Sequence, residues 1–426
     1  MPPALVGSAA VAASAPSAFA TLRARLVSGP GLRTLRSARF RLVVGAMLWA
    51  IGVVMLGSLL LRQAGTPGGN VAIDFADYRA ASLRMLEGRS PYAAEMLEGP
   101  VPAQGVDRYR YPPPFAQLLT PISVLPFDPA AALWLGIQGA TFFAGTWIAA
   151  SAGAARRSAE RFVWTGVALT YLFPVFDALW KGSFQGPIVL SMGLLVAVGA
   201  SGSGRAESAS SAIRTTTAGL LSGIVAVVRL TPLALLPAAI RADRRIAVGA
   251  VIGSLGLCVL SAGIAPKAWA DYARVLPNLL AGSVDFATNL APATVIARMG
   301  APALLVDAVR LGGLVAAVTL VVASVRFAGR AGSWPLALAC AATATLLVPG
   351  AVWYHYVAIL IPLAAFGWVQ SDLRRRLMLL ATAGFLDAGI AFLPLASLGM
   401  LLFAFATILV TWPREAAGYE RATATA

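Results

Sequence analysis

Apolar runs long enough to cross a membrane recur along most of this 426-residue chain. A helix needs about 20 consecutive apolar residues to cross the hydrocarbon core of a bilayer. Runs close to that length occupy residues 42–61, 130–151, 162–180, 187–202, 246–266, 301–324, 333–349, 352–370, 377–394 and 396–412. The chain is 58% hydrophobic and only 12% charged, with a mean hydropathy of +0.77, which excludes an ordinary soluble domain. We therefore predict an all-α polytopic membrane protein.

The net charge of +15 also has a membrane explanation. The arginines form short clusters between the apolar runs, as the positive-inside rule describes, and no basic patch is interleaved with stacking aromatic residues. We expect membrane lipids as partners and no nucleic acid. Cys258 and Cys340 lie in separate apolar runs, so they predict neither a disulfide framework nor a metal site.

The arginine clusters also predict the topology. We interpret residues 1–39 as a disordered basic cytoplasmic tail, because no basic region precedes the small-residue stretch that resembles a cleavage site. If every cluster is cytoplasmic, residues 215–240 must enter the membrane and return, turning near the sequence VVRLTP at 227–232. Counting both arms of this hairpin gives about twelve membrane helices within residues 40–412. The remaining residues, 413–426, form a cytoplasmic tail.

This topology leaves two outer segments, 62–128 and 267–300. The first holds seven of the 18 acidic residues, namely Asp74, Asp77, Glu87, Glu95, Glu98, Asp107 and Asp128. A helix is predicted from Asp74 to Gly88, lying parallel to the membrane on an apolar stripe of Phe75, Ser82, Leu83 and Leu86. The sequence RYRYPPPF at 108–115 predicts an extended segment because of its prolines, and 118–127 predicts a short dip into the interface.

Asp74, Asp77 and Tyr78 share one face of the predicted helix, at spacings of three and four residues. One interpretation is a solvated surface loop in which Asp74 caps the helix. The other is that one carboxylate, partly desolvated at the membrane boundary, is the general base of an external active site. The residues alone do not choose between these readings, or between Asp74 and Asp77.

Four stretches carry a resemblance to a known family. They are DFADYRAASLRMLEGRSPY with YRYPPPFAQLLTPISVLPF in the first outer segment, KGSFQGPIVLSMGLL at 181–195, AGLLSGIVAVVRLTPLALLP at 218–237, and LLVPGAVWYHYVAILIPLAAF at 346–366. In this order they resemble GT-C-fold glycosyltransferases of family 87. That family includes polyprenyl-phosphate-mannose-dependent α-mannosyltransferases and an arabinofuranosyltransferase. The chain departs from the family pattern in having Val348-Pro349 in place of Ser-Pro and a single histidine in place of two.

The resemblance implies a GT-C fold and transfer of a sugar, with inversion, from a polyprenyl phosphate donor to a hydroxyl group. The acceptor would be a glycolipid or a cell-envelope glycan at the outer face of a bacterial plasma membrane. Mannose is the expected sugar, and arabinofuranose is the alternative. The resemblance makes Asp74 the general base and assigns Arg229 and His355 to the donor phosphate. No cofactor and no metal are expected.

Other residues are candidates for substrate binding. An arginine at a helix centre costs about 2.5–3.5 kcal/mol, so Arg229 should face a polar cavity; the alternatives are snorkelling or a pair with Asp387. The expected substrate-binding residues are Asp77, Tyr78, Tyr109, Tyr111, Gln185, Asn289 and Trp353. Lys181 and Lys267, the only lysines, fall on the predicted outer side and could simply meet lipid headgroups.

Two other functions compete with the enzyme. A transporter or flippase for a lipid-linked sugar would also contain Arg229, Asp387 and a broken hairpin within its spans. The long acidic segment 62–128 and the absence of an internal repeat favour the enzyme. A non-catalytic scaffold for envelope assembly would not explain a carboxylate at position 74 beside a cation suited to phosphate.

Overall fold

A computed structural model describes residues 37–64, 71–101, 109–152, 154, 158–200, 209–229, 231–282, 288–348 and 350–413. Every regular element within these ranges is helical. The predicted tails fall outside the described residues, except for 37–39 and 413. The helices are α3 (Ala38–Ala64), α4 (Ile73–Leu86), α5 (Ala94–Glu98), α6 (Pro113–Ser123), α7 (Phe127–Ser151), α8 (Ala159–Tyr171), α9 (Phe173–Lys181), α10 (Gly186–Ala200), α11 (Ala209–Val228), α12 (Leu236–Ala242), α13 (Arg244–Ile264), α14 (Pro266–Ala281), α15 (Pro292–Arg298), α16 (Ala303–Ala328), α17 (Trp334–Leu347), α18 (Ile361–Gln370), α19 (Leu373–Ala388) and α20 (Leu393–Thr411), with 3-10 segments η1 (Thr231–Leu235), η2 (Tyr354–Leu360) and η3 (Gly389–Ala391).

Several of these helices are suited to cross a membrane. In the described chain five are long and apolar enough, namely α3, α11, α13, α16 and α20. The number rises to seven if each of two bent pairs, α6 with α7 and α8 with α9, is one span. The prediction of an all-helical membrane protein is therefore confirmed for the described residues, and the figure of about twelve membrane helices stays a prediction.

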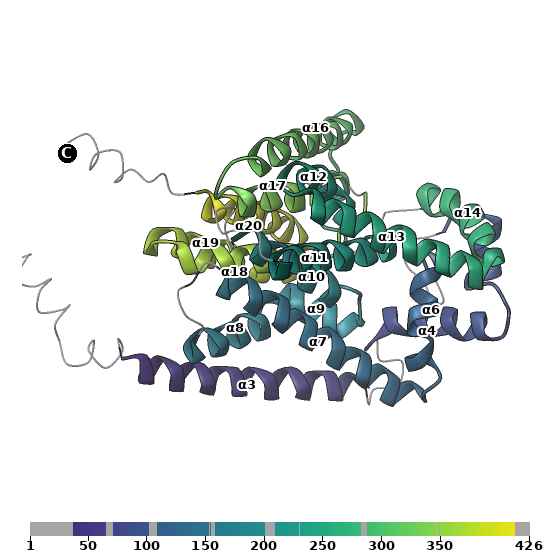
Figure 1. The fold of residues 1–426 in the computed structure, drawn as a ribbon, viewed down its shortest axis with the longest axis horizontal. Coiled ribbons are helices and arrows are strands. Elements are labelled where there is room, and N and C mark those ends of the chain that lie inside the picture. The colour runs from purple at the N-terminus through teal and green to yellow at the C-terminus, as the bar shows by residue number, and fades with distance from the viewer. Residues whose placement is uncertain are drawn as a thin grey trace, which may run out of the picture.

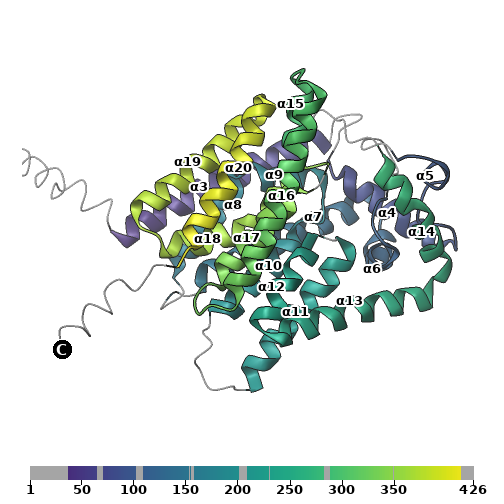
Figure 2. The same ribbon diagram turned by 90° about the horizontal axis from the view of Figure 1, so that it is seen from above.

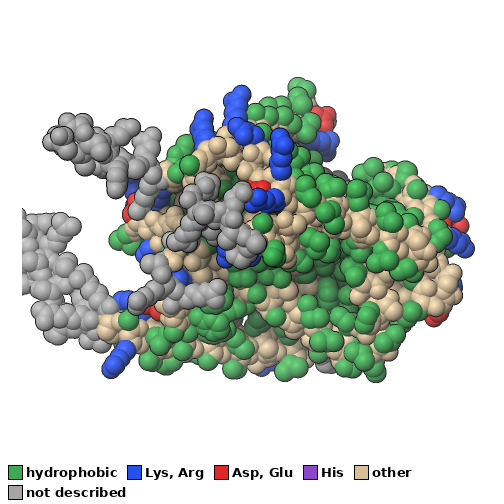
Figure 3. Space-filling view, in the orientation of Figure 1, with side chains coloured by type: hydrophobic (Ala, Val, Ile, Leu, Met, Phe, Trp, Pro, Cys, Tyr) green, Lys and Arg blue, Asp and Glu red, His purple; other side chains and the backbone are tan. Residues whose placement is uncertain are grey.

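The short helices gather at one end of the molecule. Figure 1 shows α4, α6 and α14 at one end of the molecule, and Figure 2 shows α5 beside them at that end. There the two predicted outer segments join, because Val101 N donates to Asn278 O at 3.0 Å and Asn278 Nδ2 donates to Met96 O at 2.9 Å. Figure 3 shows a broad hydrophobic surface across the middle of the molecule, with Lys and Arg side chains toward its ends. This distribution suits a body surrounded by lipid.

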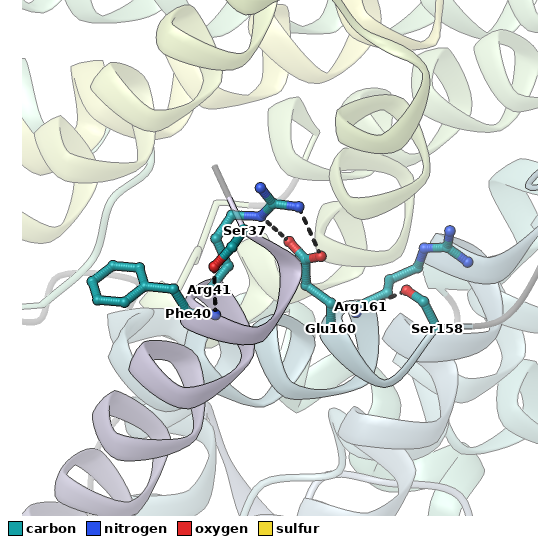
Figure 4. Close-up of polar contacts among 6 residues, drawn as sticks. All are labelled: Ser37, Phe40, Arg41, Ser158, Glu160 and Arg161. Atoms are coloured by element: carbon teal, nitrogen blue, oxygen red, sulfur yellow. Dashed lines mark hydrogen bonds and ion pairs between the residues drawn. The ribbon is translucent and has the colours of Figure 1, made fainter. Parts of the chain in front are cut away.

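Helix α3 packs on α8 at the opposite end from α4 (Figure 1). The Arg41 guanidinium holds Glu160 through two hydrogen bonds, of 2.6 and 3.2 Å (Figure 4). Further along, a Cβ added at Gly45 or Gly52 would lie under 3.0 Å from a side chain of α8, so these glycines allow close packing. The contacts advance together along both helices, and α3 and α8 therefore run parallel.

Helices α11 and α13 also run parallel, on a glycine interface. A Cβ on Gly219 or Gly223 would lie 2.2 or 2.0 Å from a backbone oxygen of α13, and a Cβ on Gly249 or Gly253 would lie 2.3 Å from one of α11. Because both helices point the same way, the chain between them must return to the level where α11 began. Helix α11 ends at Val228, where the break was expected, and a hairpin of residues 215–240 within the membrane stays a prediction.

The predicted span 162–180 is not one straight helix. It is divided into α8 and α9, which meet at an angle of 67°. Pro174, in the first turn of α9, cannot donate a hydrogen bond to α8. The Phe173 N–H donates at 3.1 Å to Asp387 Oδ1 from α19, so a distant carboxylate satisfies the broken end.

Two local predictions for the first outer segment were wrong. Pro113 and Pro114 belong to α6 and are not extended, because the first turn of a helix tolerates proline. In α4 the side chains of Phe75 and Ser82 are fully buried in the protein and do not lie on the membrane surface. Ser82 Oγ is 3.3 Å from Thr120 Oγ1 of α6. The predicted helix itself is correct, and Gly88, with φ 69°, follows its end.

The glycine interface predicts a stability difference between matched variants. Gly223→Ala should destabilise the protein by about 1–3 kcal/mol through overpacking. Gly256→Ala, on α13 with no atom within 4 Å of the added Cβ, is the control; it should be neutral or stabilising by up to about 1 kcal/mol. Thermal unfolding in one detergent compares the two. Equal melting temperatures would contradict the close approach of α11 and α13.

Candidate functional site

The first turn of α4 lies against the last turn of α9. Ala72 N donates to Trp180 O at 2.7 Å. Gly182, with φ 67°, ends α9 in the left-handed conformation that favours glycine, and a Cβ there would lie 3.1 Å from Phe75 Cβ. Trp134 Nε1 of α7 donates to Gly182 O at 2.7 Å. These contacts attach the outer segment to the helical core.

Asp74 is the second residue of α4, so it lies at this junction. It does not cap the helix: the N-cap is Ala72, without a side-chain hydrogen bond. The Asp74 side chain is partly buried. Burial raises the pKa of its carboxyl group to about 7; the charges of Lys181 and Arg229 lower this pKa, whereas Asp77 and Asp177 raise it. Asp74 is thus near half-ionised at neutral pH, as suits a general base.

Asp177, Lys181 and His355 form a hydrogen-bonded group beside Asp74. Lys181 Nζ lies 2.9 Å from Asp177 Oδ1 and 3.1 Å from its Oδ2. His355 Nδ1, from η2, lies 2.7 Å from Asp177 Oδ2. Asp177 and His355 are buried and Lys181 is partly buried. The charge of Asp177 is therefore matched within the protein.

Arg229 follows directly after α11 and is partly buried. Its guanidinium lies over the Tyr356 ring, 3.7 Å from the ring centroid. Its Nη1 is buried and has no hydrogen-bond partner among the described residues. Since Arg229 acts electrostatically on Asp74, this cation belongs to the same site. Its free donor is suited to an anionic ligand.

Tyrosines from the outer segment line the same region. Tyr78 Oη and Tyr111 Oη are 3.1 Å apart, and the ring of Tyr78 packs edge-on against Phe115 at 4.8 Å. Tyr109 has a different environment. It is fully buried, its hydroxyl donates to Pro112 O at 2.7 Å and it accepts from Ala116 N at 2.9 Å. Tyr109 therefore holds the start of α6, and its predicted contact with substrate has no support in this geometry.

The remaining candidates differ in environment. Asn289 is fully buried, donates to Gly350 O at 2.8 Å and accepts from Val352 N at 2.9 Å. It therefore joins two loop segments, and its predicted role in sugar binding is likewise unsupported. Gln185 is buried with an unpartnered Nε2 within the described chain. Trp353 stacks on His355 with a centroid separation of 6.2 Å.

Sequence reasoning missed Asp177, and for Lys181 it offered only a contact with lipid headgroups. Asp177 lay unnoticed inside a predicted span, although an acid within an apolar run is itself a functional signal. Its spacing of four residues from Lys181 also indicates a helical ion pair. Among the described residues Arg229 makes no ion pair with Asp387, whose Oδ1 accepts from Phe173 N instead. Asp387 therefore has a local structural role at the start of α9.

The site thus offers a carboxylate that can take a proton, a cation with a free donor, and a histidine held by one ring nitrogen. Such a set can bind a phosphate and activate a hydroxyl group. In the part of the chain that the structure describes, no three His, Cys, Asp or Glu side chains are grouped so as to hold a metal ion.

A comparison with protein-family models matches residues 109–349, more than half of the chain, to Glycosyltransferase family 87. No curated protein matches the chain. The matched range includes Asp177, Lys181 and Arg229, and it ends before His355. Asp74 precedes it, so its assignment depends on the geometry described above.

Proposed function

This chain belongs to glycosyltransferase family 87 and is a membrane glycosyltransferase, and from that premise we propose its donor, its acceptor and its base. The donor is a polyprenyl phosphate sugar, with mannose the expected sugar. The acceptor is a hydroxyl group of a glycolipid or cell-envelope glycan outside a bacterial plasma membrane. The observation that carries the proposal is the proximity of Asp74, with its raised pKa, to Arg229 and to the Asp177–His355 pair.

In the proposed reaction the acceptor oxygen attacks the anomeric carbon and its proton passes to Asp74. The bond from that carbon to the phosphate oxygen breaks, and its electron pair stays on the phosphate, which gains negative charge. Arg229 and His355 meet this charge. Attack from the face opposite the phosphate inverts the anomeric centre. Tyr78 and Tyr111 offer hydroxyl groups next to the base for positioning a sugar.

Replacing the base should nearly abolish transfer. Asp74→Asn should lower the rate about 100- to 10,000-fold, the usual contribution of a general base. Purified protein would be incubated with a panel of polyprenyl phosphate sugars and candidate acceptors, and the glycosylated products measured. Asp307→Asn, which alters an exposed carboxylate on α16, is the matched control and should retain full activity. Equal transfer by Asp74→Asn and the wild type would exclude Asp74 as the base.

The pKa of Asp74 predicts an acid limit to the activity. Only the ionised carboxylate can take a proton, so the rate should fall as the pH drops below about 7. Asp77 raises this pKa, and Asp77→Asn should therefore move the acid limb to lower pH while transfer continues. The profile of kcat/KM against pH tests both statements. If Asp77→Asn loses transfer and Asp74→Asn keeps it, Asp77 is the base.

Removing the positive charge of Arg229 should weaken binding of the polyprenyl phosphate sugar. Charged hydrogen bonds contribute about 1.5–3 kcal/mol, so Arg229→Met should raise the apparent KM for the donor about 10- to 100-fold. Arg229→Lys keeps the charge but loses the planar guanidinium group, so its donor KM should lie between those of the wild type and Arg229→Met. The acceptor KM is the internal control. An unchanged donor KM in Arg229→Met would refute the phosphate role.

A further inference from the structure

Asp177 holds His355 at two points. Its Oδ2 is 2.7 Å from His355 Nδ1 and also accepts from the His355 backbone N–H at 3.3 Å. The same oxygen accepts from Lys181 Nζ at 3.1 Å, and Oδ1 lies 2.9 Å from that nitrogen. One carboxylate thus connects the end of α9 with the start of η2.

These donors determine which ring nitrogen of His355 carries the hydrogen. A carboxylate oxygen that faces a lysine ammonium and a backbone N–H acts as an acceptor, so Nδ1 must be the donor to it. The neutral ring then has its lone pair at Nε2. Nδ1 is occupied by Asp177, and Nε2 is the only ring nitrogen left to meet a ligand. The ring also packs against Trp353, stacked at 6.2 Å, and edge-on against Tyr356, at a centroid separation of 5.0 Å.

The charges around the ring come from few elements. The charged residues that act on the ring are Asp177, Lys181 and Arg229. The other helices packed on η2, namely α10, α17, α18 and α20, contain no Asp, Glu, Lys, Arg or His. The charge of Lys181 offsets that of Asp177. An anion that binds near Arg229 therefore adds negative charge near the ring, and this shifts the protonation equilibrium of His355 toward the imidazolium.

We propose that Asp177 is a positioning residue that holds His355 as the Nδ1–H tautomer and so commits Nε2 to the phosphate of the donor. When the phosphate binds, the ring takes up one proton from water at Nε2 and donates that hydrogen bond to a phosphate oxygen. Nδ1–H remains on Asp177 throughout, as in other pairs where a carboxylate orients a histidine. This role rests on the proposed function, because it assigns the ligand from the reaction.

The only histidine of the chain makes a direct test possible. In protein labelled with 15N-histidine, every imidazole signal comes from His355, and the two nitrogens report the tautomer. The wild type without ligand should show Nδ1–H, and adding a polyprenyl phosphate should convert the ring to the imidazolium. Asp177→Asn should lose the single tautomer, because its amide cannot accept from both His355 and Lys181. A wild-type ring that is protonated only at Nε2 would overturn the proposal.

Kinetics supply the second readout. Asp177→Asn should lower kcat/KM for the donor about 10- to 100-fold, as loss of an orienting partner does. In the His355→Ala background the same change should have little further effect, because Asp177 acts through His355. Independent, multiplicative losses would indicate a merely structural role and refute the proposal. Asp307→Asn is the matched control for activity and for the NMR signals.

The two hypotheses fail in different ways. A wild type that transfers sugar but has the wrong tautomer overturns the role of Asp177 and leaves the proposed function standing. A wild type with the Nδ1–H ring that transfers sugar from no lipid phosphate overturns the proposed function and the phosphate role with it. Should Asp177→Asn not fold, the wild-type spectrum with and without polyprenyl phosphate still decides the tautomer and the proton uptake.

Discussion

The contact between the start of α4 and the end of α9 is the interaction on which the site depends. The hydrogen bond from Ala72 N to Trp180 O joins a segment outside the long helices to the core. It brings Asp74, in the first turn of one helix, close to Lys181, in the last turn of another. Each charge lies at the helix end whose dipole favours it. The carboxylate is thereby partly withdrawn from water without losing cations nearby.

Burying a charge in an apolar body is costly unless an opposite charge or hydrogen bonds compensate it. The charged residues of the site differ in how fully they are compensated. Asp177 is bonded to Lys181 and His355, so removing one partner would leave an unmatched buried charge. Arg229 lies over the face of Tyr356 and near the charge of Asp74, and its Nη1 has no hydrogen-bond partner among the described residues. Asp74 responds to burial by a raised pKa. Asp177, with its partners Lys181 and His355, is suited to fix the geometry of the site. Arg229 and Asp74, which are less fully compensated, are suited to act on a substrate.

Broken helices deliver these side chains. At the bend between α8 and α9, Pro174 has no N–H that needs a partner, and Asp387 accepts a hydrogen bond from the N–H of Phe173. Helix α11 ends at Val228, so Arg229 is the first residue after the helix. Non-helical backbone within a membrane protein is tolerated where protein surrounds it. Both breaks occur next to the site. Without them, the helices would not place Asp177 and Arg229 there.

Sequence reasoning found the parts of the site that have local signals. Asp74 stands out in an acidic segment, Arg229 is a charge inside an apolar run, and His355 is the sole histidine. It overlooked the local signal of Asp177, an acid inside an apolar run, and it could not show that this residue meets His355, which lies 178 positions further along the chain. It also assigned Tyr109 and Asn289 to substrate. Their residue types suit a sugar, but their hydrogen bonds are used within the protein.

The sequence by itself determined the class of protein, the polar character of residues 62–128, the helix that carries Asp74 and the break after Val228. Each of these follows from composition, periodicity or a proline, which act over a few neighbouring residues. Only the tertiary structure decided which charges meet. The Asp177–His355 bond and the approach of Asp74 to Lys181 depend on helix direction, bend and register, and local residue patterns do not encode those quantities.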